Sequence, residues 1–462
     1  MDFNNRIISR RVLRSAAWLW LAVLPWQAFA QSIVKRGAPV RHGNAWTETY
    51  EWTDAAREGG KLILRADMGS VHITPGPGNQ LEGRVVLRVY TASEEKARRV
   101  FDAYQLSARS IEGGDVYVSG ELSGWRHDRS VGAEFDIKLP ARFNLDVETQ
   151  GGDIGLEGPL QGEARLTTAG GDIHAMDISG PSRVETAGGG ISLGNVGARA
   201  EVRTAGGSIH IGNVRGDATI ETSGGEIQVG QVDGTLRAET AGGDVVIGGA
   251  GGQVMAQTAG GQIQVGPTGG GVRAETAGGS ILLRGAHGQV VAETAGGCID
   301  LLQLAAGVRA TTSAGRILAE FDATAKTFAA SQLETSVGDV YVYLPAGLPL
   351  TIDAAIDAAA GHHIVTDFPL TILGDKEDFS ERTIRGHGTL NGGGEVLRIR
   401  TVAGNIEIRK LDSRSLEDLK SREETNWSRS QERQVEKERR QREREQERQE
   451  RQQEKEEERD QD

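Results

Sequence analysis

A threonine recurs along this chain at a constant interval of eighteen positions, as from Thr168 to Thr186. Each of these threonines opens the phrase T-A-G-G-x-I or a close variant, and related phrases begin at Thr149 (TQGGDI), Thr335 (TSVGDV) and Thr401 (TVAGNI). A fixed short period with one hydrophobic pattern per unit is typical of a solenoid, in which each repeat contacts only its neighbours. The regular series consists of Thr168, Thr186, Thr204, Thr222, Thr240, Thr258, Thr276, Thr294 and Thr312.

Within each repeat, apolar residues occupy alternate positions. Counted from the threonine as position 0, position 5 is Ile or Val and position 7 is usually apolar, while the residues four and two before the next threonine are apolar or small. This period of two predicts a β-strand with one buried face. A helical repeat is excluded, because two consecutive glycines per unit would each cost a helix about 1 kcal/mol.

The paired glycines, which contribute to a total of 64, predict a sharp turn between strands. Glycine adopts positive φ freely and lets neighbouring backbones approach closely, and either property would explain its place at the corner of a coil. By parity the threonine column points inward. Because a buried hydroxyl needs a partner, we expect the stacked threonine hydroxyls to hydrogen-bond to one another.

Two neighbouring inward columns exchange volume along the series. The residue four before the threonine is small and the residue two before it is large in the pair Ala200/Val202, whereas the sizes are reversed from Leu236/Ala238 onward. Such compensation is expected of two facing positions that share a fixed space in one close-packed core.

These patterns predict an all-β fold, namely a parallel β-helix or solenoid with triangular coils of one eighteen-residue repeat each. Right-handed winding is the usual hand of parallel β connections, although left-handed coils built of three hexapeptides have the same repeat length. We expect the solenoid to occupy residues 146–410, with regular coils at 149–318. An irregular C-terminal cap is expected at 319–410, where a binding loop is the alternative.

Residues 1–30 have the composition of a secretory signal peptide. Four arginines precede an apolar stretch from Ala16 to Leu24, and Ala28-Phe29-Ala30 is a small-x-small cleavage site. The apolar stretch is too short to span a bilayer, which disfavours a membrane anchor. The sequence therefore predicts an exported protein, periplasmic or extracellular at the cell surface, with no transmembrane segment after signal removal.

Between the signal peptide and the solenoid we expect a linker at residues 31–45 and a β-rich cap with one helix at residues 46–145. Such a cap would cover the bare strand edge of the first coil. Thr91-x-x-Glu94 is a capping box, which predicts a helix from there to about Leu106. One face of this helix carries Ala97, Val100, Phe101 and Tyr104.

The C-terminal residues 411–462 are rich in Glu, Arg and Gln. Pairs such as Glu436/Arg440 have the favourable order for helix support, but no apolar seam is present for a coiled coil. A solvated tail, helical or disordered, is the simplest interpretation. An interaction tail for an envelope partner is the alternative.

Charge and spacing limit the chemistry of the chain. The net charge of −13 becomes about −16 without the four arginines and one aspartate of residues 1–30, which argues against nucleic acid as a partner. Asp153 and Asp172 share position 4 of successive coils, but the column continues with Gly, Ser and Gln, so no metal ladder is expected. His174 and His210 lie two coils apart, about 10 Å, which is too far for one metal ion.

Other polar residues also have simple structural interpretations. Cys298, the only cysteine, fills the same variable position and forms no internal disulfide. The region from Thr168 to Thr312 contains no Trp, Tyr or Phe, which disfavours a glycan cleft on these coils. We expect no catalytic residues, no cofactor and no metal. Alternating charges on a solvated sheet are expected from the outward residues Glu185, Glu221, Glu239, Glu275 and Glu293 with Arg183, Arg237 and Arg273.

Three phrases resemble the bacterial "putative adhesin" domain of unknown function, a family of exported proteins with G-D-I repeats. They are FDIKLPARFNLDVETQGGDI (135–154), DVYVYLPAGLPLTID (339–353) and GTLNGGGEVLRIRTVAGNIEIRK (388–410). The resemblance covers residues 60–410 and implies a β-solenoid related in shape to the bactofilin rods, with an adhesive or envelope role. It supplies no catalytic residues, and the regular threonine series and the charged tail depart from the family's pattern.

The sequence thus favours an exported, non-enzymatic β-solenoid that acts as an adhesin or as an interaction surface of the envelope. The alternative is a periplasmic scaffold that self-associates end to end and recruits partners through its charged tail. A carbohydrate-active β-helix enzyme is a third hypothesis. The expected partner is an envelope or surface protein or a glycan.

Replacing Ala256 with leucine is expected to lower the free energy of unfolding by about 1–3 kcal/mol, because the added volume overpacks an inward column beside Val254. The effect is measured as a lower urea midpoint. An unchanged midpoint would refute the assignment of Ala256 to the core.

Overall fold

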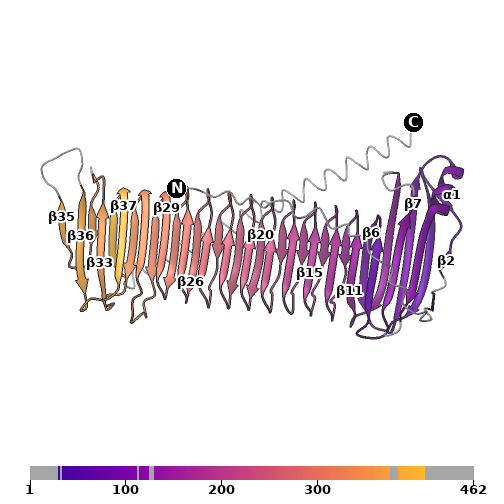
Figure 1. Cartoon of the computed structure of the whole chain (residues 1–462), viewed down its shortest axis with the longest axis horizontal. Helices are drawn as coiled ribbons and strands as arrows, with labels where there is room; N and C mark the ends of the chain where they lie inside the picture. Colours follow the sequence, from indigo (N-terminus) through magenta and orange to yellow (C-terminus); the bar gives the residue numbers. More distant parts are fainter. Residues whose placement is uncertain are drawn as a thin grey trace, which may run out of the picture.

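The computed structural model describes residues 30–31, 34–111, 114–123, 130–359, 361–374 and 383–411. Apart from Ala30 and Leu411, the predicted signal peptide and charged tail lie outside these residues. The described chain is an elongated rod of stacked β-strands with one helix at its N-terminal end (Figure 1). The all-β solenoid that the sequence predicts is confirmed.

One side of the rod, the Thr sheet, consists of strands that end at or beside the repeated threonines. They pair in parallel in steps of one repeat, so that Thr168 lies opposite Thr186 and Thr186 opposite Thr204. The strands are β11 (Asn144–Thr149), β13 (Ala164–Thr168), β15 (Ser182–Thr186), β17 (Ala200–Thr204), β19 (Ala218–Glu221), β21 (Leu236–Glu239), β23 (Val254–Gln257), β25 (Val272–Glu275), β27 (Val290–Thr294), β29 (Val308–Ala314) and β31 (Ser331–Val337).

The other large side, the Ile sheet, begins in each regular coil with the Ile or Val of position 5. A third, narrow side is joined by single bridges between residues such as Ile178 and Val196. The strands of the Ile sheet are β12 (Ile154–Leu156), β14 (Ile173–Ala175), β16 (Ile191–Leu193), β18 (Ile209–Ile211), β20 (Ile227–Val232), β22 (Val245–Ala250), β24 (Ile263–Val265), β26 (Ile281–Ala286), β28 (Ile299–Leu304), β30 (Ile317–Phe321) and β32 (Val340–Leu344).

The core runs along the axis of the rod between these sides. Ala200, Val202, Leu236 and Ala238 have no exposed surface, so the two columns that exchange volume do face one interior. The threonine column is also buried, from Thr149 to Thr401. The predicted orientation of all three columns is therefore correct.

The threonine hydroxyls do not bond to one another, and our expectation on this point is wrong. Thr186 Oγ1 donates to the carbonyl oxygen of Gly171 in the preceding coil at 2.8 Å, and accepts the N–H of Gly189 in its own coil at 3.3 Å. Equivalent threonines lie one strand spacing apart, about 4.8 Å, which exceeds hydrogen-bond distance. The bond from each threonine hydroxyl to the preceding coil, here called the Thr–Gly clamp, repeats at every threonine up to Thr312.

The two glycines of each turn have different roles. A Cβ on Gly279 would overlap the carbonyl oxygen of Gly261, whereas a Cβ on Gly278 would lie 3.6 Å from its nearest neighbour, the carbonyl oxygen of Gly260. Accordingly, the turns that follow Thr312, Thr335 and Thr401 carry Ala, Val and Ala at the first position, at residues 314, 337 and 403. The second glycine is thus required by close approach at the turns from Gly171 to Gly297, and among the second glycines positive φ occurs at Gly152 (φ 121°), Gly315, Gly338 and Gly404.

At the N-terminal end the coils do not stack in chain order. β5 (Lys61–Ala66) and β6 (Ser70–Gly76) pair in parallel with β11 and β12 on one side, and with β9 (Val116–Leu122) and β10 (Val131–Pro140) on the other. An early segment is thus inserted between two later ones. The clamp follows this spatial order, because Thr149 Oγ1 donates to the carbonyl oxygen of Gly69 at 2.9 Å.

Antiparallel strands cover this end. β7 (Gln80–Tyr90) pairs with β10, β4 (Ala45–Ala55) pairs with β7, and β8 (Tyr104–Ser110) pairs with β9. The short strands β1 (Ala30–Gln31), β2 (Lys35–Arg36) and β3 (Val40–His42) pair with β8 or β4.

The single helix of the described chain, α1 (Glu94–Ala103), lies beside these strands. Its N-cap is Ser93, which accepts the N–H of Lys96, and not Thr91, whose hydroxyl accepts the N–H of Ser93. The helix ends at Ala103, before the expected Leu106, because the next residue is extended and begins β8. The predicted buried face is confirmed at Ala97, Val100 and Phe101.

At the C-terminal end a late segment is inserted between two earlier ones. β37 (Val396–Ala403) lies between β31 and β33 (Leu350–Ile356), and β38 (Ile406–Lys410) lies between β32 and β34 (Ile364–Thr366). Thr401 Oγ1 therefore clamps the carbonyl oxygen of Gly338 at 3.0 Å. The antiparallel strands β36 (Ile384–Leu390) and β35 (Thr371–Gly374) follow β33 outward, as Figure 1 shows.

Replacing Gly279 with alanine is expected to lower the free energy of unfolding by about 1–3 kcal/mol, because the two coils must separate and the clamp from Thr276 to Gly261 is stretched. Gly278→Ala in the same turn is the control, with an expected change below about 0.5 kcal/mol. The two free energies are compared by urea unfolding, and equal losses would contradict the role assigned to the second glycine.

Candidate functional site

The polar side chains at position 4 join neighbouring coils. Asp153 Oδ1 accepts the N–H of Asp172 at 2.8 Å, and Asp172 Oδ1 accepts the N–H of Gly190 at 2.6 Å. The hydroxyl of Ser280 accepts the N–H of Cys298 in the same way at 3.1 Å. Asp153 and Asp172, which occupy position 4 of successive coils, therefore accept hydrogen bonds from backbone N–H groups. Short polar residues of different types can fill this role at position 4.

The other polar candidates do not converge on one site. His174 is exposed, whereas His210 Nε2 lies 3.2 Å from Glu226 Oε1. Cys298 is partly buried in the position-4 column. In the described part of the chain, no group of three or more His, Cys, Asp and Glu residues is placed to hold a metal ion.

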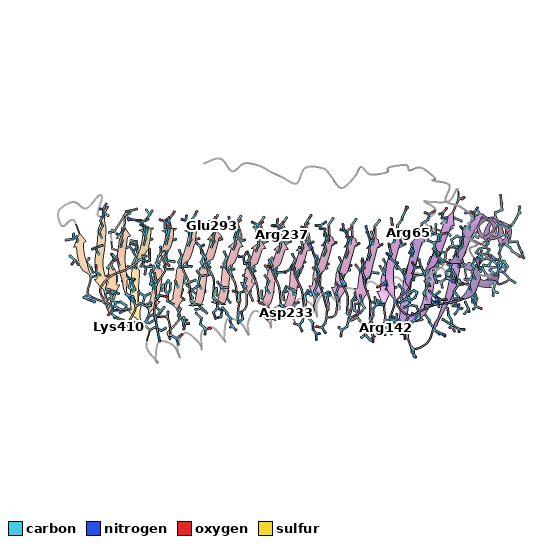
Figure 2. All side chains as sticks on the ribbon, turned by 60° about the horizontal axis from the view of Figure 1, so that its bottom comes forward. Arg65, Arg142, Asp233, Arg237, Glu293 and Lys410 are labelled. Atoms are coloured by element: carbon cyan, nitrogen blue, oxygen red, sulfur yellow. The ribbon has the colours of Figure 1, made fainter. Side chains whose placement is uncertain are left out.

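Charges on the outer face of the Thr sheet are paired with one another. Arg183 lies 2.7 Å from Glu185 and 3.3 Å from Glu201, and Arg203 lies 3.0 Å from Glu201 and 3.2 Å from Glu221. Arg237–Glu239 and Arg273–Glu275 continue this charge ladder along the rod. Figure 2 shows Arg65, Arg237 and Glu293 spread along this side. The expected alternation is present, and each exposed pair contributes little to stability.

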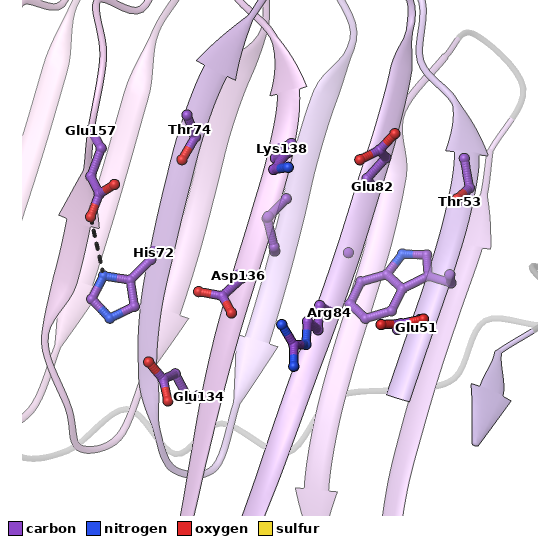
Figure 3. A pocket seen from close by; sticks show the side chains of 13 residues that line it. Glu51, Thr53, His72, Thr74, Glu82, Arg84, Glu134, Asp136, Lys138 and Glu157 are labelled. Carbon is purple, nitrogen blue, oxygen red and sulfur yellow. Dashed lines mark ion pairs between the residues drawn. The ribbon is translucent and has the colours of Figure 1, made fainter. Parts of the chain in front are cut away.

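A hollow of different character lies at the N-terminal end, on the outer face of β4, β7, β10 and β6 (Figure 3). Its volume is about 670 Å³, which is within the range of small-molecule sites. The side chains come from alternate positions of each strand, which point away from the core. They are Glu51, Thr53, His72, Thr74, Glu82, Arg84, Glu134, Asp136, Lys138 and Glu157.

Strand register sets these side chains in two rows. The first row is Glu51, Arg84, Asp136 and His72, each opposite the next on the neighbouring strand. The second row is Thr53, Glu82, Lys138 and Thr74. Acidic and basic groups therefore alternate across the floor of the hollow.

Despite this alternation, most of the charges in the two rows are not engaged with one another. His72 Nδ1 lies 3.8 Å from Glu157 Oε1, and beside the rows Glu134 lies 3.9 Å from Arg88. No other ion pair within 4.0 Å joins the lining side chains to residues that the structure describes. The charges of the hollow thus remain available to a ligand, unlike those of the charge ladder.

A second hollow of about 620 Å³ continues the first along the same strands and shares Arg84, Glu134 and Asp136 with it. Together the two hollows form one extended trough, here called the N-terminal groove. The second hollow adds His42, Asn44, Ala45, Thr47, Thr49, Val86, Arg88 and Tyr90.

The groove offers charged and hydroxyl side chains as donors and acceptors, and in its second hollow His42 Nδ1 lies 3.1 Å from Thr47 Oγ1. The sequence alone does not predict this site. The alternation of Glu82–Gly83–Arg84 and Glu134–Phe135–Asp136 indicates outward polar residues, yet a period of two does not say which strands become neighbours.

The family described as Toastrack DUF4097, a domain of unknown function, matches residues 133–266. These residues extend from β10 to just beyond β24, and of the four strands of the groove they include β10 alone. No curated protein matches the chain. Within the described residues, no helix is long and apolar enough to cross a membrane.

Three solved structures are similar to this chain. A "putative adhesin" from Bacteroides fragilis is 12% identical over 52% of this chain and 95% of its own, with a TM-score of 0.26. A "putative cell adhesion protein" from Clostridium sporogenes is 10% identical over 78% and 99%, with a TM-score of 0.14. A "putative lipid binding protein" from Parabacteroides distasonis is 10% identical over 79% and 97%, with a TM-score of 0.15.

A partly buried ion-pair cluster at the N-terminal end of the Thr sheet predicts a pH dependence of stability. Asp146 lies 2.7 Å from Arg65 and 3.4 Å from Lys61, across the junction of β5 and β11. Burial alone would raise the pKa of Asp146, but the hydrogen bonds and charges of Arg65 and Lys61 outweigh burial and lower it. Because the pKa is lower in the folded state, the carboxylate stabilises the fold above about pH 4, and this contribution is lost as the pH falls through the folded-state pKa.

We therefore expect Asp146→Asn to be less stable than the parent at pH 7 and to lose less stability between about pH 5 and pH 2. Thermal midpoints measured across this range test the prediction. Parallel curves for the parent and the variant would show that the pair with Arg65 does not couple folding to protonation.

Proposed function

We propose that this chain, which carries a Toastrack DUF4097 domain at residues 133–266, is an exported, non-enzymatic β-solenoid that binds a partner at the cell surface or in the envelope, as an adhesin does. The rod acts as a rigid spacer. The N-terminal groove is the binding end. The charged tail at residues 411–462 follows the C-terminal end of the solenoid in the sequence.

The observation that carries this proposal is the contrast between the rod and its N-terminal end. Along the rod, the threonines and the position-4 residues bond to neighbouring coils, and Arg183 and Arg203 pair with glutamates of the next coil. In the groove, Arg84, Asp136 and Lys138 face solvent without a described ion-pair partner within 4.0 Å. Polar groups that are engaged between coils support the shape, whereas polar groups gathered in a hollow and not paired with one another support binding.

A periplasmic scaffold that assembles end to end is the second candidate. At the C-terminal end, β35 carries Ile372 and Leu373 with 44% and 68% of their surface exposed. Apolar side chains on a terminal strand favour association with another sheet edge. This function would require concentration-dependent filaments, which sedimentation of the purified chain would detect, and the charged tail would then recruit partners.

Protease treatment of intact cells tests the proposal. Blotting with separate antibodies against the rod and against residues 411–462 shows which part is accessible. We expect the rod to be labelled at the surface of intact cells and degraded or released by the protease. Full protection of both parts until the outer envelope is opened would contradict the adhesin function and favour the periplasmic scaffold.

A further inference from the structure

We infer that the N-terminal groove binds a neutral, hydroxyl-rich oligosaccharide, the exposed segment of a glycan. This inference rests on the proposed function, because it names the class of partner that the binding end takes.

The position of the groove within its sheet limits the possible ligands. β6, β10 and β7 are paired on both sides, and β4 is paired to β7 along its length, so the backbone N–H and C=O groups across the floor of the groove are used in the ladders. Extended peptides often bind by adding a strand to a free sheet edge, through main-chain hydrogen bonds. The groove lies on a sheet face and offers only side chains, which disfavours an extended peptide and favours a ligand that is itself rich in hydroxyls.

The side chains of the groove match the donors and acceptors of sugar hydroxyls. A hydroxyl group donates one hydrogen bond and accepts others, so adjacent hydroxyls need acceptors and donors side by side. Arg84 stands between Glu51 and Asp136, and Lys138 stands between Glu82 and Thr74. Hydrogen bonds in which one partner is ionised are about twice as strong as those between neutral groups. The charged side chains of the two rows are therefore suited to bind the hydroxyls of an uncharged sugar ring.

The balance of charge in the first hollow argues against an anionic glycan. The first hollow is lined by the five acidic residues Glu51, Glu82, Glu134, Asp136 and Glu157, against Arg84 and Lys138. The whole chain also carries a net charge of −13. An anionic polysaccharide would meet like charge both at the site and during its approach.

Size and rigidity favour an oligomer over a single sugar. Two hollows of about 670 Å³ and 620 Å³ adjoin through Arg84, Glu134 and Asp136. Beneath them, the Trp52 ring fills the space where a side chain at Gly83 would lie, which holds β4 against β7. At the far end of the second hollow, Tyr90 exposes 45% of its surface and offers an aromatic face. A preorganised trough loses less entropy when it binds a flexible chain.

Calorimetric titration of the purified full chain tests the inference. The neutral probes are β-1,4-linked tetramers of glucose and of N-acetylglucosamine, the anionic probe is a galacturonate tetramer, and the peptide probe is a lysine tetramer. We expect binding of at least one neutral tetramer and no binding of galacturonate. Arg84→Gln and Asp136→Asn are each expected to weaken the neutral probe by about tenfold or more, because each removes a charged hydrogen-bonding partner.

Arg237→Gln is the matched control, since Arg237 pairs with Glu239 on the Thr sheet far from the groove, and its affinity should equal that of the parent. Thermal unfolding confirms that each variant is folded. Binding of galacturonate or tetralysine alone, binding that survives both groove substitutions, or no binding of either neutral tetramer would overturn the inference. Surface exposure by protease treatment is independent of these titrations, so a failed titration leaves the proposed function standing.

Discussion

The approach of the second glycine of each turn to the carbonyl group of the preceding coil determines how the remainder of the rod packs. A Cβ on Gly189 would overlap the carbonyl oxygen of Gly171, and that same oxygen receives the hydroxyl of Thr186 at 2.8 Å. Contact and hydrogen bond therefore reinforce each other at one corner, and a wider spacing would lose both. Once the corner fixes the distance between coils, the strands on both sides pair in register and the inward columns have a constant volume to fill. The exchange of size between Ala200/Val202 and Leu236/Ala238 is a consequence of that constant volume.

The same corner is used where each end of the rod departs from chain order. At either end a coil is inserted out of chain order, and the clamps at Thr149 and Thr401 join coils that are neighbours in space but distant in sequence. Antiparallel strands then follow, β7 on β10 at one end and β36 on β33 at the other. Antiparallel strands take up the edge groups of a parallel coil but do not offer another copy of the repeat, so the stack of coils is terminated. This change of direction at the N-terminal end also creates the sheet face on which the groove lies.

The sequence predicts the regular coils well, because their signal is repeated in every unit and concerns only neighbours. Burial of the position-5 residues, the inward threonines and the outward Arg–Glu ladder all follow from parity. Our prediction of the acceptor for the Thr186 hydroxyl is wrong, because parity gives the direction of a side chain but not the position of the neighbouring carbonyl group along the rod axis. The insertions at the two ends were missed because pairing between β5 and β11 joins residues about 80 positions apart, as in Arg65 and Asp146, and no period relates them. The groove depends on similar long-range pairing, of β10 with β6 and β7, so it could not be predicted from local alternation.

The outward charges of this molecule fall into two groups: those that form ion pairs on the Thr sheet, and those that line the N-terminal groove. On the Thr sheet, Arg183 and Arg203 each lie between two Glu residues, and the distances of 2.7 to 3.3 Å leave little freedom to accept a ligand. On the outer face of β7 and β10 the same residue types alternate, yet Arg84 and Asp136 form no described ion pair within 4.0 Å. An exposed pair that forms contributes little to stability, so selection for stability gives little reason to gather unlike charges in a hollow without joining them. Binding does give such a reason, because separated donors and acceptors can each engage a ligand group. We therefore regard the N-terminal end as the functional part of the molecule and the repeated coils as its support.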